Sequence, residues 1–266
     1  MIGLSISEWT LEATSTAEAI RRVAAAGYRA IELAAVPELD VRAAAERLDA
    51  YGVAVSSMCW IGLSYPDRDC AHESERVRRQ AGDYLRSCLE QASALGAKAL
   101  VVVPTFRPEP DHTGREAELE RSAQTIAAAA QEMAADGPLI ALEALNRYET
   151  HLLRTLADAD ELRRAIDLPN VQLMADVFHM SIEEDSIAAA LRAHAEHIVH
   201  LHLADSQRRE PGSGHLDFAA VFEVLADTKY AGALTMEFLP ATDAAMRAGR
   251  EWVQAHLSNV PWRMAT

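Results

Sequence analysis

The amino-acid sequence predicts a single α/β domain over residues 1–266, folded as a (β/α)8 barrel, also called a TIM barrel. Short apolar segments alternate with Ala-rich helical segments from one end of the chain to the other. Eight apolar segments in 266 residues correspond to roughly 33 residues per unit, which is the size of one βα repeat. No linker rich in Pro, Gly or Ser divides the chain, so we expect one domain.

The predicted strands are short and apolar, as expected for a parallel sheet that is buried on both faces. They are residues 2–7, 29–33, 53–58, 99–104, 139–143, 171–176, 198–203 and 233–238. Eight such units favour a closed barrel over an open doubly wound sheet. The GxGxxG motif that would follow the first strand of a dinucleotide-binding sheet is absent from the sequence.

The Ala-rich segments between the strands are predicted helices, among them residues 16–27, 74–96 and 118–137. Each of these three segments ends in a glycine, the usual C-terminal stop of a helix: Gly27, Gly96 and Gly137. Asp40 and Asp217 stand where an N-cap would stabilise the start of a helix.

The amino-acid composition limits the kinds of partner and the cellular location that we expect for this protein. Acidic residues number 40 against 25 basic ones, and the net charge of −15 repels both nucleic acid and anionic membranes. The three cysteines form no CxxC pair, and their odd number argues against a disulfide framework. The N-terminus lacks the pattern of a signal peptide, and no run approaches the roughly 18 apolar residues of a membrane helix. We therefore expect a cytoplasmic protein.

Each of the last four predicted strands carries a side chain that can bind a metal ion at its last or next-to-last residue: Glu143, Asp176, His202 and Glu237. In a parallel barrel these strand ends converge on the point where such barrels carry out chemistry. One histidine with three carboxylates makes an oxygen-rich site, which suits Mn²⁺, Mg²⁺ or Co²⁺ better than Zn²⁺ or copper. Any one of the four could instead cap a helix or lie in the core, but four at the same barrel end favour a metal site.

Strand alternation extends this prediction. If the four side chains point into the barrel, the residues two positions earlier do so as well. These neighbours are Ala141, Met174, His200 and Thr235. Glu32, at the end of the second strand, either orients one of the ligands or only forms a salt bridge.

The second half of the chain resembles a known family. The segments EALNRYETHLL, ADVFHMSIEEDS, HLHLADSQRREPGSGHLDF and YAGALTMEF are similar to those of the D-tagatose and D-psicose (allulose) 3-epimerases, within the xylose-isomerase-like barrels. The resemblance covers about residues 139 to 238 in motif and spacing. It is weaker in the first half, where it rests on IEL at 31–33 and CWIGL at 59–63.

The resemblance implies roles for particular residues. It implies one divalent ion, Mn²⁺ before Mg²⁺ or Co²⁺, bound by the four strand-end residues, with Glu143 and Glu237 also acting as the acid/base pair. It implies binding of the O1–O3 end of a sugar by Glu149, His179 and Arg208. From the residues themselves, Glu149 could equally cap a helix starting near His151, and Arg208 could be a solvated loop charge beside Arg209. A homodimer or homotetramer is also implied.

Aromatic residues are expected to form the walls of the sugar site. Trp9 and Trp60 follow strand ends, although tryptophans at such positions more often serve packing. After the fourth strand, Phe106 and Arg107 stand where many members of the resembled family have a Trp-Pro element. We expect these two residues to shape the pocket around the far end of the sugar.

These observations predict a metal-dependent epimerase that acts on a free ketose at C3 through a metal-stabilised cis-enediolate. The same barrel also serves rival reactions. A hydroxypyruvate-type or aldose–ketose isomerase would move a proton between C1 and C2, and an inosose-type dehydratase or another β-eliminating lyase would expel a leaving group. An endonuclease IV-like phosphodiesterase is disfavoured because the chain is too acidic for DNA.

Overall fold

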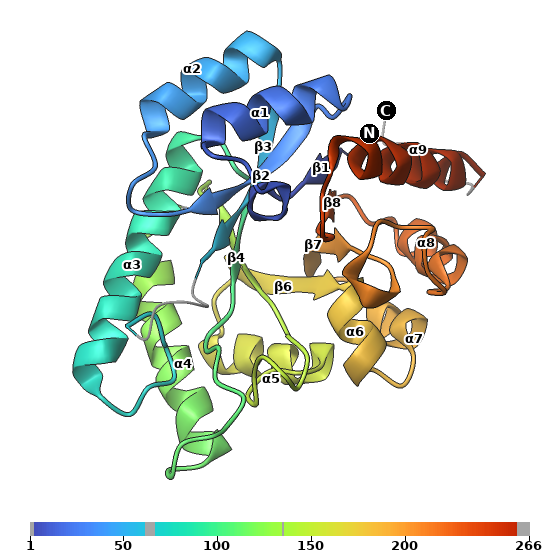
Figure 1. Ribbon diagram of the computed structural model, residues 1–266. Coiled ribbons are helices and arrows are strands. Elements are labelled where there is room, and N and C mark those ends of the chain that lie inside the picture. Colours follow the sequence, from blue (N-terminus) through green and yellow to red (C-terminus); the bar gives the residue numbers. More distant parts are fainter. Residues whose placement is uncertain (1–2, 62–66, 135, 260–266) are drawn as a thin grey trace.

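The computed structural model describes residues 3–61, 67–134 and 136–259, which form one parallel eight-stranded sheet surrounded by helices (Figure 1). The strands are β1 (Leu4–Ile6), β2 (Ala30–Ala35), β3 (Ala54–Trp60), β4 (Ala99–Val102), β5 (Leu139–Leu142), β6 (Val171–Asp176), β7 (Ile198–Leu203) and β8 (Ala233–Met236). Their order is β1-β8-β7-β6-β5-β4-β3-β2, and a parallel bridge between Ser7 and Glu32 joins the two ends of the sheet. The predicted barrel is therefore confirmed.

Helices follow the strands and cover the outside of the sheet (Figure 1). They are α1 (Thr16–Ala25), α2 (Val41–Tyr51), α3 (Glu75–Ala94), α4 (Arg115–Ala130), α5 (Leu156–Ile166), α6 (Val177–Glu183), α7 (Ile187–Ala193), α8 (Phe218–Asp227) and α9 (Asp243–Asn259), with the 3-10 helices η1 (Glu8–Leu11) and η2 (Ser206–Arg208). Among the helices of the described residues, none has the length and apolar composition that crossing a bilayer requires.

The ends of the helices follow the sequence in most places. Asp40 and Asp217 accept backbone hydrogen bonds at the starts of α2 and α8, as N-caps do. Gly27 and Gly96 follow α1 and α3 with φ of +87° and +70°, the left-handed region that glycine adopts freely. The prediction that the fourth helix runs to Gly137 is wrong, because α4 ends at Ala130. There the Ala130 carbonyl accepts a hydrogen bond from Asn170 Nδ2 (2.8 Å), a contact from a distant loop.

All eight predicted strands are present, and four of them, β1, β4, β5 and β8, end one or two residues earlier than predicted. β5 ends at Leu142 and β8 at Met236, so that Glu143 and Glu237 lie one residue beyond them. Their backbones nevertheless continue the ladder, because Glu143 N donates to Val102 O and Glu237 N to Leu203 O, both at 3.0 Å. The barrel therefore fixes the backbone of both glutamates.

Two apolar layers hold the barrel together. A large cluster fills the space between sheet and helices, and it includes Leu33, Leu100, Ile140, Leu173 and Leu201. A smaller cluster consists of Cys59, Ala99, Val101, Ala141 and Met174. The residues of the smaller cluster alternate along their strands with those of the outer layer, which places them inside the barrel. Ala141 and Met174 thus face inward, as predicted.

Candidate active site

The four predicted strand-end residues lie together inside one end of the barrel. Glu143, Asp176, His202 and Glu237 each offer one ligand atom, and these atoms all lie within 4.8 Å of one another. His202 Nδ1 lies 3.1 Å from Glu237 Oε2, 3.8 Å from Glu143 Oε1 and 3.9 Å from Asp176 Oδ2. All four residues are buried. The structure therefore contains a candidate metal-binding cluster.

Two atoms of this cluster are buried and form no hydrogen bond of good geometry among the described residues: His202 Nδ1, although Glu237 Oε2 is 3.1 Å away, and Asp176 Oδ2. The other end of each side chain is already bound. His202 Nε2 lies 3.0 Å from Glu32 Oε2, and Asp176 Oδ1 caps α6 by accepting from the backbone N–H groups of Phe178 and His179. Buried polar atoms normally have partners, and a divalent cation between these two would satisfy both. The residues present thus fit a metal ion.

Electrostatics distinguish the two glutamates. Burial raises the pKa of Glu143 well above its ordinary value, and the neighbouring charges of Glu237 and Asp176 raise it further. Burial also acts to raise the pKa of Glu237, but the positive charges of His202 and Arg208 hold that pKa well below the ordinary range. Burial raises the pKa of Asp176 to about 7. Three carboxyl groups buried close together are consistent with a site for a cation.

Glu32 lies beneath the cluster and is fully buried. Its Oε2 accepts from Ser57 Oγ at 2.8 Å and lies 3.0 Å from the Nε2 atoms of both His200 and His202. His200 therefore faces inward with His202, as strand alternation predicts. Of the two roles left open for Glu32, the contacts support orientation of a ligand, because its bond to Nε2 leaves Nδ1 of His202 turned toward the cluster.

Arg208 reaches the cluster from η2. Its Nη2 donates to Glu237 Oε2 and lies 3.6 Å from Asp176 Oδ2. The guanidinium carbon lies 5.4 Å from the centre of the Trp9 ring and 4.9 Å from that of Phe178, within the range of cation–π attraction. Arg208, and not Arg209, is thus the arginine that faces the cluster.

The backbone that carries Arg208 adopts an unusual conformation. Gln207 and Arg208 both have positive φ, 62° and 55°, which costs about 1–3 kcal/mol at each non-glycine residue. Hydrogen bonds to Asp205 compensate, because its buried carboxylate accepts from the backbone N–H of Ser206 and from three backbone N–H groups of the following loop, those of Gly212, Gly214 and Leu216. Burial acts to raise the pKa of Asp205, but these hydrogen bonds lower it overall. The segment PGSGH, residues 211–215, is therefore a tight turn held by the Asp205 carboxylate.

His179 and Glu149 lie beside Arg208 and share one neighbour. His179 Nδ1 lies 2.8 Å from Asn146 Nδ2, and the same amide donates to Glu149 Oε1 at 2.8 Å. Burial and the charge of Arg208 lower the pKa of His179 to about 3. The alternative that Glu149 caps a helix is wrong, since the next helix, α5, starts at Leu156 behind a Thr155 capping box.

The aromatic residues divide into different environments. Trp9 Nε1 donates to Glu237 Oε1 at 2.7 Å, so Trp9 belongs to the site. Trp60 does not. It is 2% exposed and packs edge-to-face on Tyr84 of α3, because its neighbour Cys59 takes the inward position on β3. Phe106 is half-buried against the outer apolar layer, and its contact with a sugar stays a prediction.

Sequence reasoning overlooked two residues of this region, Asn146 and Phe178. Both lie in segments that carry other site residues, three positions after Glu143 and two after Asp176. Neither stands at a strand end or in a periodic pattern, so only the folded loops reveal that Asn146 contacts His179 and that Phe178 packs on Arg208.

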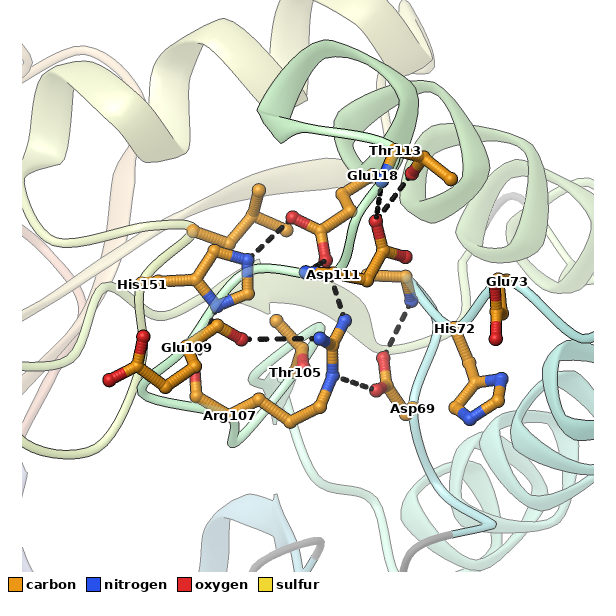
Figure 2. A network of polar contacts seen from close by, with 12 residues as sticks. Asp69, His72, Glu73, Thr105, Arg107, Glu109, Asp111, Thr113, Glu118 and His151 are labelled. Carbon is orange, nitrogen blue, oxygen red and sulfur yellow. Dashed lines mark hydrogen bonds and ion pairs between the residues drawn. The ribbon is translucent and has the colours of Figure 1, made fainter.

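Arg107 contacts neighbouring loops, which differs from the sugar-facing position expected for it. Figure 2 shows its guanidinium between two carboxylates, with Nε 2.7 Å from Asp69 Oδ2 and Nη2 2.7 Å from Glu118 Oε1. Glu118 Oε2 in turn lies 2.6 Å from His151 Nε2, and the Arg107 carbonyl accepts from His151 N. This network ties together the loops after β3, β4 and β5, which border the site.

We expect Arg107→Met to destabilise the protein by about 3 kcal/mol, because it leaves the buried carboxylates of Asp69 and Glu118 without their cation. We take the low end of the usual range since Arg107 is 30% exposed. Burial acts to raise the pKa of Glu118, but Arg107 and its other partners lower it below 4.5. Its contribution to stability is therefore present above pH 4.5 and is lost as the pH falls through the lowered value.

Urea unfolding at neutral and acidic pH measures this effect. The difference between wild type and Arg107→Met should be largest at neutral pH and narrow below pH 4.5. Arg42→Met is the matched control, because Arg42 is 90% exposed and should change stability by no more than about 0.5 kcal/mol. Equal losses in the two variants would contradict a structural role for the network.

A closed (β/α)8 barrel with acidic and imidazole side chains gathered at the C-terminal ends of its strands defines a class of barrel enzymes. The family model of the xylose isomerase-like TIM barrel matches residues 20–256, and the chain belongs to that family.

Named relatives make the class narrower. The chain is 34% identical to the 3-dehydro-D-guloside 4-epimerase of Escherichia coli K12 over 198 residues, which cover 70% of this chain and 72% of that enzyme. It is 30% identical to the D-psicose 3-epimerase of Ruminiclostridium cellulolyticum over 231 residues, 82% of this chain and 76% of that one. The solved apo structure of 3-keto-D-glucoside 4-epimerase from E. coli matches with a TM-score of 0.85 and 26% identity, covering 96% of this chain and all of that one. The chain is thus an enzyme similar to sugar epimerases.

Proposed function

We propose that this protein epimerises a free ketose at C3, the carbon next to the ketone. The observation that carries the proposal is the placement of two buried glutamates, Glu143 and Glu237, at the ends of β5 and β8 around the same small cluster. Epimerisation needs one group to remove a proton from one face of a carbon and another to return a proton to the opposite face. Similarity to the D-psicose 3-epimerase supports the choice of C3.

In the proposed reaction, one glutamate takes the proton from C3 and the electron pair moves toward the ketone oxygen, which gives an enediolate. The other glutamate donates a proton to the opposite face of C3, and the ketone re-forms with the centre inverted. Each glutamate ends in the protonation state in which the other began, so the reverse reaction uses the same pair. Arg208, His179 and Glu149 lie beside the pair and are proposed to bind the sugar's oxygens.

We propose that Glu143, Asp176, His202 and Glu237 hold one divalent ion, with Mn²⁺ favoured over Mg²⁺ and Co²⁺ for a set of three carboxylates and one imidazole. When bound, the ion would supply positive charge that stabilises the enediolate. The two partnerless atoms, His202 Nδ1 and Asp176 Oδ2, support this assignment. Cytoplasmic location and a homodimer or homotetramer stay predictions.

A second candidate is epimerisation at C4 of a 3-keto-glycoside, as the E. coli relative's name describes. The chemistry is the same at this site, because C4 of such a sugar also lies next to a ketone. The candidates differ in the group beyond the reacting carbons, and therefore in what the rim of the pocket must accept.

Incubation with a panel of ketohexoses, ketopentoses and 3-keto-glycosides in heavy water, with Mn²⁺, tests these proposals. We expect a C3 epimer of a free ketose, with one deuterium at C3 and no loss of water. Deuterium at C4 of a glycoside would favour the second candidate. Deuterium at C1 or C2 would indicate an aldose–ketose or hydroxypyruvate-type isomerase, and loss of water a dehydratase or other lyase. Either result would contradict both proposals.

A further inference from the structure

The His179 ring has hydrogen-bond donors at both of its nitrogens. Nδ1 lies 3.2 Å from the backbone N and 2.8 Å from the side-chain Nδ2 of Asn146. Nε2 lies 3.2 Å from Nη1 of Arg208. A neutral imidazole has one acceptor nitrogen and one donor nitrogen, and an imidazolium has two donors. The ring therefore cannot accept at both ends.

The contacts of Asn146 decide which nitrogen accepts. Its Oδ1 accepts from the backbone N–H of Tyr148 at 3.0 Å, and its Nδ2 donates to Glu149 Oε1 at 2.8 Å. Rotating the side-chain amide by 180° would place Oδ1 against the Glu149 carboxylate. The Nδ2 group is therefore the one that faces His179. The backbone N–H of Asn146 cannot be exchanged for an acceptor at all. Two fixed donors at Nδ1 thus leave that nitrogen unprotonated, and the ring proton is on Nε2.

This tautomer creates an opening for a ligand oxygen. The Nε2–H of His179 then faces an N–H of Arg208 at 3.2 Å, and two donors so placed repel each other. The carboxylate oxygen Asp176 Oδ2 lies 3.5 Å from Nε2, too far for a good hydrogen bond. One oxygen atom placed between the two donors would accept from both. Burial, which lowers the pKa of His179 to about 3, agrees with a neutral ring.

We propose that Asn146 is a positioning residue that holds His179 as the Nε2–H tautomer, so that His179 and Arg208 donate to one oxygen of the substrate. That the oxygen belongs to a sugar rests on the proposed function; the tautomer does not. The oxygen must be a pure acceptor at this point, such as a ketone oxygen or the oxyanion that forms from it. Preorganised donors at such a position stabilise the charge that develops during proton abstraction.

Long-range ¹H–¹⁵N correlation spectra of the Mg²⁺-loaded protein, labelled with [¹⁵N]histidine, test the tautomer. Mg²⁺ replaces Mn²⁺ because it is diamagnetic, and His179→Gln identifies the His179 signals by their loss. We expect the pattern of a neutral ring protonated at Nε2. A ring protonated at Nδ1, or at both nitrogens, would overturn the proposal.

Asn146→Asp tests the positioning role. It replaces the amide donor by a carboxylate acceptor at Nδ1, so we expect the ring proton to move to Nδ1 and kcat/KM to fall about 10²-fold. Asn170→Asp is the matched control: Asn170 bonds the Ala130 carbonyl at the end of α4, and its replacement should leave the His179 signals and kcat/KM unchanged.

An unchanged His179 pattern in folded Asn146→Asp would contradict the positioning role. Should that variant fail to fold, the wild-type spectrum still decides the tautomer. An Nε2–H ring in a protein that epimerises no sugar would support the tautomer and contradict the proposed function, so the two ideas fail separately.

Discussion

Replacing Glu143 by glutamine is expected to lower kcat for epimerisation by about 10⁴-fold, the upper end of the effect of removing a general base. Glutamine keeps the size of the side chain but cannot take up a proton. It also removes one negative charge from a cluster in which Glu143, Asp176 and Glu237 lie around His202. Transfer of deuterium from heavy water should fall by the same factor for the epimer whose C3 proton Glu143 removes, because exchange and inversion of that epimer begin with the same proton abstraction.

The control for this result is Glu46→Gln on α2, where the glutamate is 67% exposed and pairs with Arg42 along the helix. It should leave kcat unchanged. Thermal unfolding of both variants shows whether they are folded, and the buried Glu143 variant should be no less stable than wild type, because an uncharged amide avoids the desolvation of a buried carboxylate. Epimerisation by folded Glu143→Gln at the wild-type rate would refute the proposed acid/base pair.

The strand-end residues could be predicted because their positions follow from local pattern and barrel geometry. Apolar runs mark the strands, period-two alternation sets the faces, and closure of a parallel barrel brings the strand ends together. The same reasoning placed His200 inward with His202, and both contact Glu32. The prediction that Trp60 lines the site failed. Cys59 and Trp60 are the last two residues of β3, and only the packing of Trp60 against Tyr84 shows that Trp60 faces outward.

The loop contacts could not be predicted in this way, because they join segments that are far apart in the sequence. Arg107 stands in a loop that was expected to meet the sugar, yet its partners Asp69 and Glu118 come from two other parts of the chain. The end of α4 forms a hydrogen bond with Asn170, forty residues away. These polar contacts leave no periodic signal, whereas burial of apolar residues does.

Removal of divalent metal by a chelator is expected to abolish epimerisation, and added Mn²⁺ to restore it. The physical reason lies in the buried acids of the site and in the partnerless atoms His202 Nδ1 and Asp176 Oδ2. A metal ion that binds the folded chain and not the unfolded chain raises the free energy of unfolding, by about 2.7 kcal/mol when the free metal concentration is a hundredfold above Kd. Tm should therefore rise with Mn²⁺ concentration, which thermal unfolding measures without any substrate.

Asp176→Asn separates metal binding from folding. Asparagine keeps an oxygen that can accept from the N–H groups of Phe178 and His179 and so cap α6, but it places an amide nitrogen where Oδ2 faced the cluster. The metal-free variant should have a Tm close to that of the metal-free wild type. It should lose most of the rise in Tm with Mn²⁺, because one anionic ligand is gone. If wild type stayed active after chelation, or if Asp176→Asn kept the full rise, the four residues would not form the proposed metal site.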